Sequence, residues 1–285
     1  MDLFEIMKMK KLKKGEKGLT LLELIIAIAI TSLITGGVAT IVYQIYTVSA
    51  RSSNHMVAVR QVQEAGYWVS LYAYTSQNTT INGTSGFPLI LQWVNFDPSG
   101  RHKIVFNLNS SGLRGSYYVD SGSGYVLDSA RTGKIPVFAF INSTLTNCQV
   151  SGGSDFSLPV SGNKFVITRG ATNDSGRITT APSGDISKIS VNATAGATAT
   201  YDSATKAWTW NTTAAGSNIT VTATSAVKGS WTSETRAATA AITQGTGATL
   251  SSARGLVFTI TAIVGTGRNE ASETRTYKVV PKPVS

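Results

Sequence analysis

The chain has 285 residues, a formal net charge of +10 and only 14% charged residues. Ser, Thr, Ala, Gly and Asn crowd its middle and C-terminal half, which is typical of secreted β-rich proteins and not of a cytoplasmic enzyme. The one cysteine of this sequence, Cys148, excludes an intrachain disulfide and a thiolate metal cluster. We expect Cys148 to be a buried small apolar residue, with pairing to another subunit as the alternative.

The basic charge is unevenly placed. Residues 1–18 carry six lysines against three acidic residues, a net of +3, and the rest of the chain keeps 19 basic and 12 acidic residues. A basic surface can attract DNA, anionic lipid or acidic glycans. Dispersed, solvated charge is the alternative, so the composition alone does not assign a DNA or glycan ligand.

A long apolar segment follows the lysines. The stretch from Leu24 to Val48 has 25 residues, enough to cross a membrane once as a helix. Upstream lysines would hold the N-terminus in the cytoplasm by the positive-inside rule. This predicts a single-pass protein of the cytoplasmic membrane with its N-terminus inside.

Three alternatives for the cleavage of this segment are possible. An ordinary secretory signal would be cut after the apolar stretch, near Gly37-Val38-Ala39, and a plain anchor would not be cut. A cut before the stretch would instead leave the apolar helix on the mature protein. Glu23 favours the third, because a carboxylate at the start of a membrane helix is costly and points to a functional role.

The block from Lys13 to about residue 40 resembles the type IV prepilin signature. There a glycine precedes the cut, an apolar residue follows it, and a glutamate is fifth in the mature chain. Counting from Leu19 places Glu23 fifth, whereas a cut after Gly15 would place Thr20 there. Only Gly18 therefore fits the pattern.

The resemblance implies specific roles. A prepilin peptidase would cut between Gly18 and Leu19 and N-methylate Leu19, and Gly18→Val should block the cut. Glu23 would face the N-terminal amine of a neighbouring subunit during assembly, a pairing that neutralises two costly buried charges. Further implied partners are other pilin or pseudopilin subunits and an inner-membrane assembly platform. The mature protein would end in an extracytoplasmic filament or at the cell surface.

Many pilins of this family have a proline inside the helix, and none occurs here between residues 19 and 87. Gly36 and Gly37 are the candidate weak point, since each glycine costs about 1 kcal/mol relative to alanine in a helix. Close packing against another helix is the alternative for this pair.

Helical periodicity continues beyond the apolar segment. Ala58, Val62, Ala65, Val69 and Tyr72 form one apolar stripe at 4-3-4-3 spacing. We therefore predict a helix over residues 19–76, with 19–48 as its transmembrane half. The predicted fold class is α+β, with this long helix followed by an antiparallel β-sheet head.

The head is predicted in three parts. Residues 77–150 form a pilin-like β region, 151–254 an inserted β-sandwich-like subdomain, and 255–285 the C-terminal strands. Turn clusters separate the expected strands, which are 102–108, 115–119, 135–140, 164–168, 188–193, 197–201, 207–210, 218–224, 256–264 and 274–280. The stretch Ile104–Val119, with Leu113-Arg114, also resembles the minor pilin and pseudopilin J/W group.

No catalytic set is evident. The two histidines, His55 and His102, lie far apart in the sequence, and no nucleophile, phosphate-binding or metalloprotease motif occurs. Gly152–Asp155 and Asn173–Gly176 lack the regular acidic spacing of a calcium loop and are expected to be solvated turns. We predict a non-enzymatic filament subunit, a minor pilin or pseudopilin, without metal or cofactor. The alternative is a tip adhesin or a DNA- or glycan-binding module on a pilin-like anchor, in which exposed tryptophans would contact the ligand. We expect Trp208, Trp210 and Trp231 instead to lie in a core, since Trp208 and Trp210 share one face by the strand period.

Overall fold

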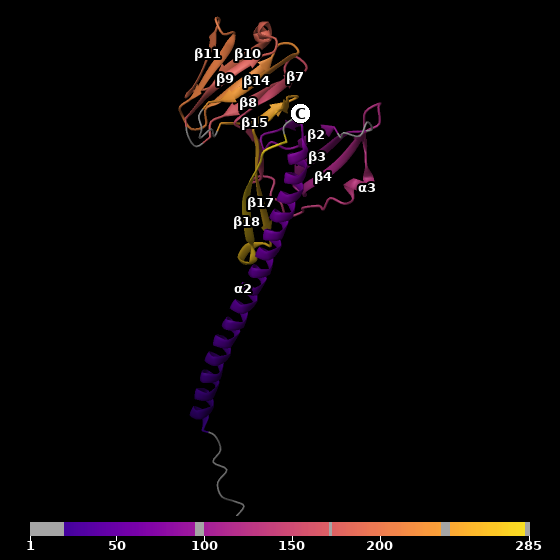
Figure 1. Ribbon diagram of the computed structural model, residues 1–285. Helices are drawn as coiled ribbons and strands as arrows, with labels where there is room; N and C mark the ends of the chain where they lie inside the picture. The colour runs from indigo at the N-terminus through magenta and orange to yellow at the C-terminus, as the bar shows by residue number, and fades with distance from the viewer. Residues whose placement is uncertain (1–19, 95–99, 171–172, 235–239, 283–285) are drawn as a thin grey trace, which may run out of the picture. The chain divides into compact units, whose positions relative to one another are not determined.

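The computed structural model describes residues 20–94, 100–170, 173–234 and 240–282 (Figure 1). Its contacts divide the chain into two units, Met1–Ser52 and Ser53–Ser285. One helix, α2 (Leu21–Thr75), contributes to both. This confirms the predicted long N-terminal helix, whose predicted first residue, 19, lies outside the described residues.

The second unit holds two antiparallel sheets, which confirms the α+β fold class. The larger sheet has the order β11-β12-β9-β14-β7-β16-β1-β2-β3-β4-β5. Its strands in that order are Ala197–Asp202, Ala207–Thr212, Asp174–Thr180, Val227–Ser233, Gly153–Leu158, Thr249–Ser251, Asn78–Ile81, Leu89–Val94, Arg101–Asn109, Gly112–Asp120 and Tyr125–Leu127. A short helix, α3 (Ser129–Thr132), follows β5.

The smaller sheet has the order β10-β13-β8-β15-β6-β17-β18. Its strands in that order are Ile189–Ala193, Asn218–Ala223, Lys164–Thr168, Ala241–Thr246, Asn147–Ser151, Gly255–Val264 and Ala271–Val279. Two 3₁₀ turns, η1 (Ser183–Lys188) and η2 (Gly267–Asn269), precede β10 and β18.

Both sheets run through the predicted head and the predicted insertion. In the larger sheet β16 pairs with β1 on one side and with β7 on the other. In the smaller sheet β6 pairs with both β15 and β17. The boundaries 77–150, 151–254 and 255–285 stay predictions.

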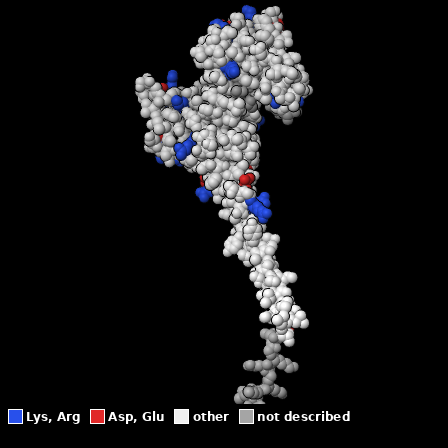
Figure 2. All heavy atoms as spheres, turned by 180° about the vertical axis from the view of Figure 1, so that it is seen from behind, with Lys and Arg blue, Asp and Glu red and all other residues white. Residues whose placement is uncertain are grey.

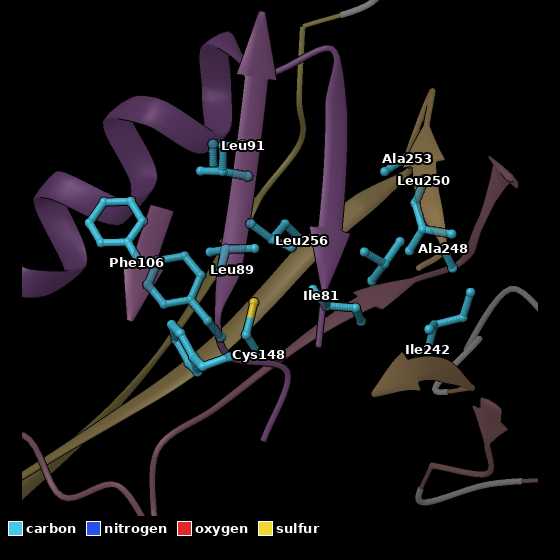
Figure 3. Close-up of a cluster of buried hydrophobic side chains, with 14 of the residues drawn as sticks. Ile81, Leu89, Leu91, Phe106, Cys148, Ile242, Ala248, Leu250, Ala253 and Leu256 are labelled. Atoms are coloured by element: carbon cyan, nitrogen blue, oxygen red, sulfur yellow. The ribbon is translucent and has the colours of Figure 1, made fainter. Parts of the chain in front are cut away.

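The core lies between the two sheets (Figure 3). Ile81, Leu89 and Leu250 come from the larger sheet, and Ile242 and Leu256 from the smaller one; all five are at most 1% exposed. Cys148 on β6 lies among these side chains, as expected of a small apolar residue, and burial raises the pKa of its thiol.

The expected strand at residues 135–140 is wrong. Ile135 and Phe138 are buried, but the segment is a turn held by one bridge between Phe138 and Leu113. Pro136 lacks the N–H that a ladder needs, so the apolar residues here anchor an irregular loop instead of forming a strand. The expected solvated turns at Asn173–Gly176 and Gly152–Asp155 are also wrong, because Gly153–Asp155 begin strand β7 and Gly153 and Ser154 are buried.

Asp174 begins β9 and is 2% exposed. Its carboxylate accepts hydrogen bonds from the Ser233 hydroxyl at 2.6 Å and the Ala240 amide at 3.2 Å. These partners lie 59 and 66 residues further along the chain, and they satisfy a carboxylate that would otherwise be costly to bury.

The second half of α2 is packed into the head from two sides (Figure 1). The Tyr72 ring lies 6.2 Å from the Phe106 ring of β3 and 6.1 Å from the Tyr117 ring of β4. From β18, the Tyr277 hydroxyl donates a hydrogen bond to the Val62 carbonyl at 3.0 Å. Aromatic side chains of both sheets therefore contact the second half of α2.

Candidate assembly site on the N-terminal helix

The start of α2 is a capping box formed by Thr20 and Glu23. The Glu23 amide donates to the Thr20 hydroxyl at 3.3 Å, while the Thr20 amide and hydroxyl each donate to Glu23 Oε2 at 3.0 Å. The two residues thus satisfy the donors that a helix N-terminus leaves unpaired. The Thr-x-x-Glu spacing is the sequence signal for this motif. The sequence analysis singled out Glu23 and did not predict its pairing with Thr20.

Both hydrogen bonds from Thr20 end on the same carboxylate oxygen of Glu23. Among the described residues, Glu23 Oε1 has no hydrogen-bond partner. The capping box therefore fixes the rotamer of Glu23 and still leaves one oxygen open to another donor. Gly18 and Leu19, the predicted cleavage residues, lie outside the described residues.

The surface of the first half of α2 is apolar and exposed. Every residue from Thr20 to Tyr46 is exposed, including Leu21 at 76% and Leu33 at 79%. None of these side chains is buried, and the helix is long and apolar enough to cross a membrane. Such a surface is unstable in water and requires a lipid or protein cover.

The hydroxyl side chains within this apolar surface are bonded to the helix itself. Thr31, Thr35, Thr40 and Thr47 each donate to the carbonyl four residues earlier, and Ser32 donates to Ala29. These bonds satisfy the hydroxyl donors where water is absent. Polar residues in the segment are consequently compatible with a membrane span.

Gly36 and Gly37 lie inside the uninterrupted helix. A Cβ at either position would meet no atom within 4 Å. Gly36 also lines a shallow groove with small residues on one helix face; its other lining residues are Ala27, Ile28, Thr31, Ser32, Thr35 and Ala39. Neither the flexibility role nor the packing role of the two glycines is tested by these observations.

The family described as the prokaryotic N-terminal methylation motif matches residues 13–39. This match covers the N-terminal segment and supports a type IV prepilin-like protein. The motif implies processing by a prepilin peptidase and assembly with other pilin subunits, as a structural subunit. Together with the exposed apolar helix it fits membrane anchoring followed by incorporation into a filament. No curated protein and no solved structure gives a match to the chain.

The described part of the head gives no candidate metal site. No group of three or more His, Cys, Asp or Glu residues suited to a metal occurs among the described residues. Trp210 and Trp231 are buried and Trp208 is partly buried against the core, so the expectation of a core role holds for the first two. On the face drawn in Figure 2, lysine and arginine side chains of the head are scattered and do not form one patch.

Proposed function

We propose that the chain is a minor pilin or pseudopilin of a type IV pilus or a type II secretion-type filament. It is cut between Gly18 and Leu19 and N-methylated on Leu19. The observation that carries this proposal is the methylation motif at 13–39 leading directly into a helix whose apolar surface is exposed from Thr20 to Tyr46. A cut before that helix keeps it on the mature subunit, where it serves first as anchor and then as filament core.

The physical need for a cover supports assembly through this helix. Burying apolar surface is favourable by roughly 25 cal/mol per Å². Lipid supplies the cover while the subunit waits in the cytoplasmic membrane with its N-terminus inside, and the helices of other subunits supply it in the filament. Transfer between the two covers requires an assembly platform in the inner membrane that extracts the subunit.

Glu23 is the residue that sets the register of the incoming subunit in this proposal. Its open Oε1 accepts the N-terminal amine of a neighbouring subunit while Oε2 stays with Thr20. Two opposite charges attract strongly at low dielectric, and either one alone there is costly. A subunit that is out of register would leave both charges unpaired.

Gly36 acts in helix packing in this proposal, because it lies on the face of small residues from Ala27 to Ala39. Small residues let helix backbones approach closely where no water drives association. Gly37 keeps the other predicted role, a point of flexibility, since its position in the helix is open and glycine has low helix propensity.

The experiment compares two glutamates of the same helix. In a host with a prepilin peptidase and a filament system, the full chain is produced as Glu23→Gln or Glu64→Gln, and the sheared filament fraction is measured relative to the membrane fraction. Glu64 forms an ion pair with Arg60 at 2.8 Å in the second half of α2 and controls for general charge loss.

We expect Glu23→Gln to lower the filament fraction by at least about tenfold, since losing one partner of a desolvated pair costs more than about 1.4 kcal/mol. The amount in the membrane should not change. Glu64→Gln should enter filaments like the unmodified chain. Equal entry of the two variants would contradict the role of Glu23.

A further inference from the structure

The two sheets end in four outer strands that differ in how their free edges are protected. These strands are β11 and β5 in the larger sheet and β10 and β18 in the smaller one. A free edge presents unpaired N–H and C=O groups and invites pairing with another chain unless it is short, charged or covered. The edge chemistry therefore shows which strand is left open to a partner.

β18 and β5 carry the usual protection. β18 has Glu273, Arg275 and Lys278 along its nine residues, and β5 is only three residues long. β10 (Ile-Ser-Val-Asn-Ala) and β11 (Ala-Thr-Ala-Thr-Tyr-Asp) have neither feature, since β10 carries no charge and β11 carries none before its last position. Of these two, β11 is the longer strand. Among the described residues, no strand pairs with the outer edge of β11.

The core is also incompletely covered beside β11. Ala197 and Ala199 of β11, Trp208 of β12 and Val191 of β10 pack against the core but stay partly exposed. Tyr201, next to Trp208 with its ring centroid 5.7 Å away, is 42% exposed. An added strand at this edge would bury these apolar side chains, which favours pairing.

The hydrogen bonding of the β11–β12 hairpin determines which backbone groups are available. The Thr213 amide donates to the Gly196 carbonyl at 2.8 Å, one step beyond the paired residues Ala197 and Thr212. Antiparallel ladders alternate, so even-numbered residues of β11 bond to β12. The N–H and C=O groups of Ala199 and Tyr201 consequently point to the free edge.

We propose that β11 pairs antiparallel with β11 of a second copy of this chain, around a two-fold axis at Ala199. In this register Ala199 faces Ala199 of the second copy in a hydrogen-bonded pair, and each Tyr201 lies opposite the small Ala197. Thr198 lies opposite Thr200, a favourable cross-strand pair on the exposed face.

The register is self-complementary in charge as well as in size. Asp202 is the one charged residue of the strand, and it falls opposite Gly196 of the second copy and not opposite another carboxylate. This register favours a second copy as the partner, because it brings no two charges and no two large side chains opposite each other. The Ala197 amide already donates to the Thr194 carbonyl at 3.0 Å, so the pairing bonds come from Ala199 and from the Tyr201 amide to the Ala197 carbonyl. This inference rests on the head alone and is independent of cleavage at Gly18.

A disulfide across the axis tests the register. Hydrogen-bonded pairs of an antiparallel sheet have Cα atoms about 5.5 Å apart, within the range of a disulfide. The full chain carrying Ala199→Cys is oxidised in the membranes of producing cells, with Thr276→Cys on the charged edge strand β18 as the matched control. Cys148 stays in place because it is buried.

We expect Ala199→Cys to give a covalent dimer at least about tenfold more abundant than Thr276→Cys does, the ratio that a preference of about 1.4 kcal/mol produces. Equal amounts from the two variants would overturn the proposal. Crosslinking of Ala199→Cys only to a different protein would overturn self-pairing too.

A charge pair separates strand pairing from proximity imposed by the membrane helices. In the Ala199→Cys background, Thr198→Lys with Thr200→Lys places lysine opposite lysine, while Thr198→Lys with Thr200→Glu places lysine opposite glutamate. Both threonines are exposed, so thermal unfolding should be the same for the two variants. We expect the first pair of changes to suppress the dimer several-fold and the second to retain it; equal crosslinking of both would overturn the strand register.

Discussion

The two halves of α2 share one backbone and differ completely in what covers them. From Thr20 to Tyr46 every residue is exposed, although most are apolar. From Ala58 to Ala73 the helix buries a stripe against the head and exposes the opposite face, as a helix of a globular protein does. The first half lacks a polar face altogether, which is typical of a helix made for lipid or for other helices.

The difference shows that one continuous helix can have two halves suited to different surroundings, the first to lipid or other helices and the second to the head. In the second half, packing against the head determines stability, so a change there alters the free energy of unfolding of the head. In the first half, the same kind of change alters membrane insertion or assembly and leaves the head unaffected. Matched substitutions in the two halves test this division.

The largest expected effect comes from a pair of valines. Val69 is fully buried and Val38 is 54% exposed. Val69→Ala should lower the free energy of unfolding by about 2 to 3 kcal/mol through lost burial and a cavity. Val38→Ala should change it by less than about 0.5 kcal/mol. Denaturation of the full chain in detergent, followed by tryptophan fluorescence, measures both, and similar losses would break the division.

Glycines give the next largest contrast. A Cβ on Gly66 would clash with the Cζ, Cε2 and hydroxyl atoms of Tyr277, whereas a Cβ on Gly36 would have no atom within 4 Å. Gly66→Ala should destabilise the head by about 1 to 3 kcal/mol through overpacking. Gly36→Ala should leave the same unfolding transition in place. Adding Tyr277→Ala to Gly66→Ala should produce less than the sum of the two single losses; strict additivity would show that the two residues are not in contact.

A single hydrogen bond sharpens the comparison further. Tyr277→Phe removes the bond to the Val62 carbonyl and should cost about 1 kcal/mol. Tyr67→Phe on the exposed face of the same helix is the control, since Tyr67 is 61% exposed. Equal unfolding midpoints for the two variants would mean that the bond contributes nothing.

The smallest expected effect is a pH dependence of the helix–head contact. Burial, and secondarily the charge of Arg131, lowers the pKa of His102 below 6.5. His102 lies against Trp93 and Tyr117, whose rings also contact Tyr72 of α2. Because the unfolded chain then binds more protons below about pH 6.5, stability rises with pH up to that value and falls as pH is lowered through it.

His102→Gln removes the titrating group and should flatten this slope. Urea denaturation at about pH 5 and pH 7 measures it, and the unmodified chain should have the lower free energy of unfolding at pH 5. A slope that persists in His102→Gln would assign it to other groups.

The sequence predicted best what local patterns encode. The apolar spacing from Ala58 to Val69 placed the buried stripe, and alternation with turn residues placed β8 at residues 164–168 as the structure has it. The sequence did not predict contacts between residues that lie far apart along the chain. Gly66 and Tyr277 meet across 211 positions, and Asp174 finds its partners in Ser233 and Ala240, which no local pattern reveals.

The same distinction holds at the candidate assembly site. The spacing from Gly18 to Glu23 is local, so the prediction of a cut after Gly18 rests on counting residues and stays a prediction. The capping box of Thr20 and Glu23 was equally local and present as a Thr-x-x-Glu signal. The covering of the apolar helix depends on other molecules, and the edge of β11 is free only because the sheet order places it last.

The most direct test of the account is the mass of the mature N-terminus. The full chain, produced in a host with a prepilin peptidase, is purified from membranes and its N-terminal peptide is measured, with Gly18→Val as the matched variant. The account predicts a chain that begins at Leu19 with one added methyl group, and an uncut precursor for Gly18→Val. A mature chain that begins near residue 40, or one that retains Met1, would contradict it.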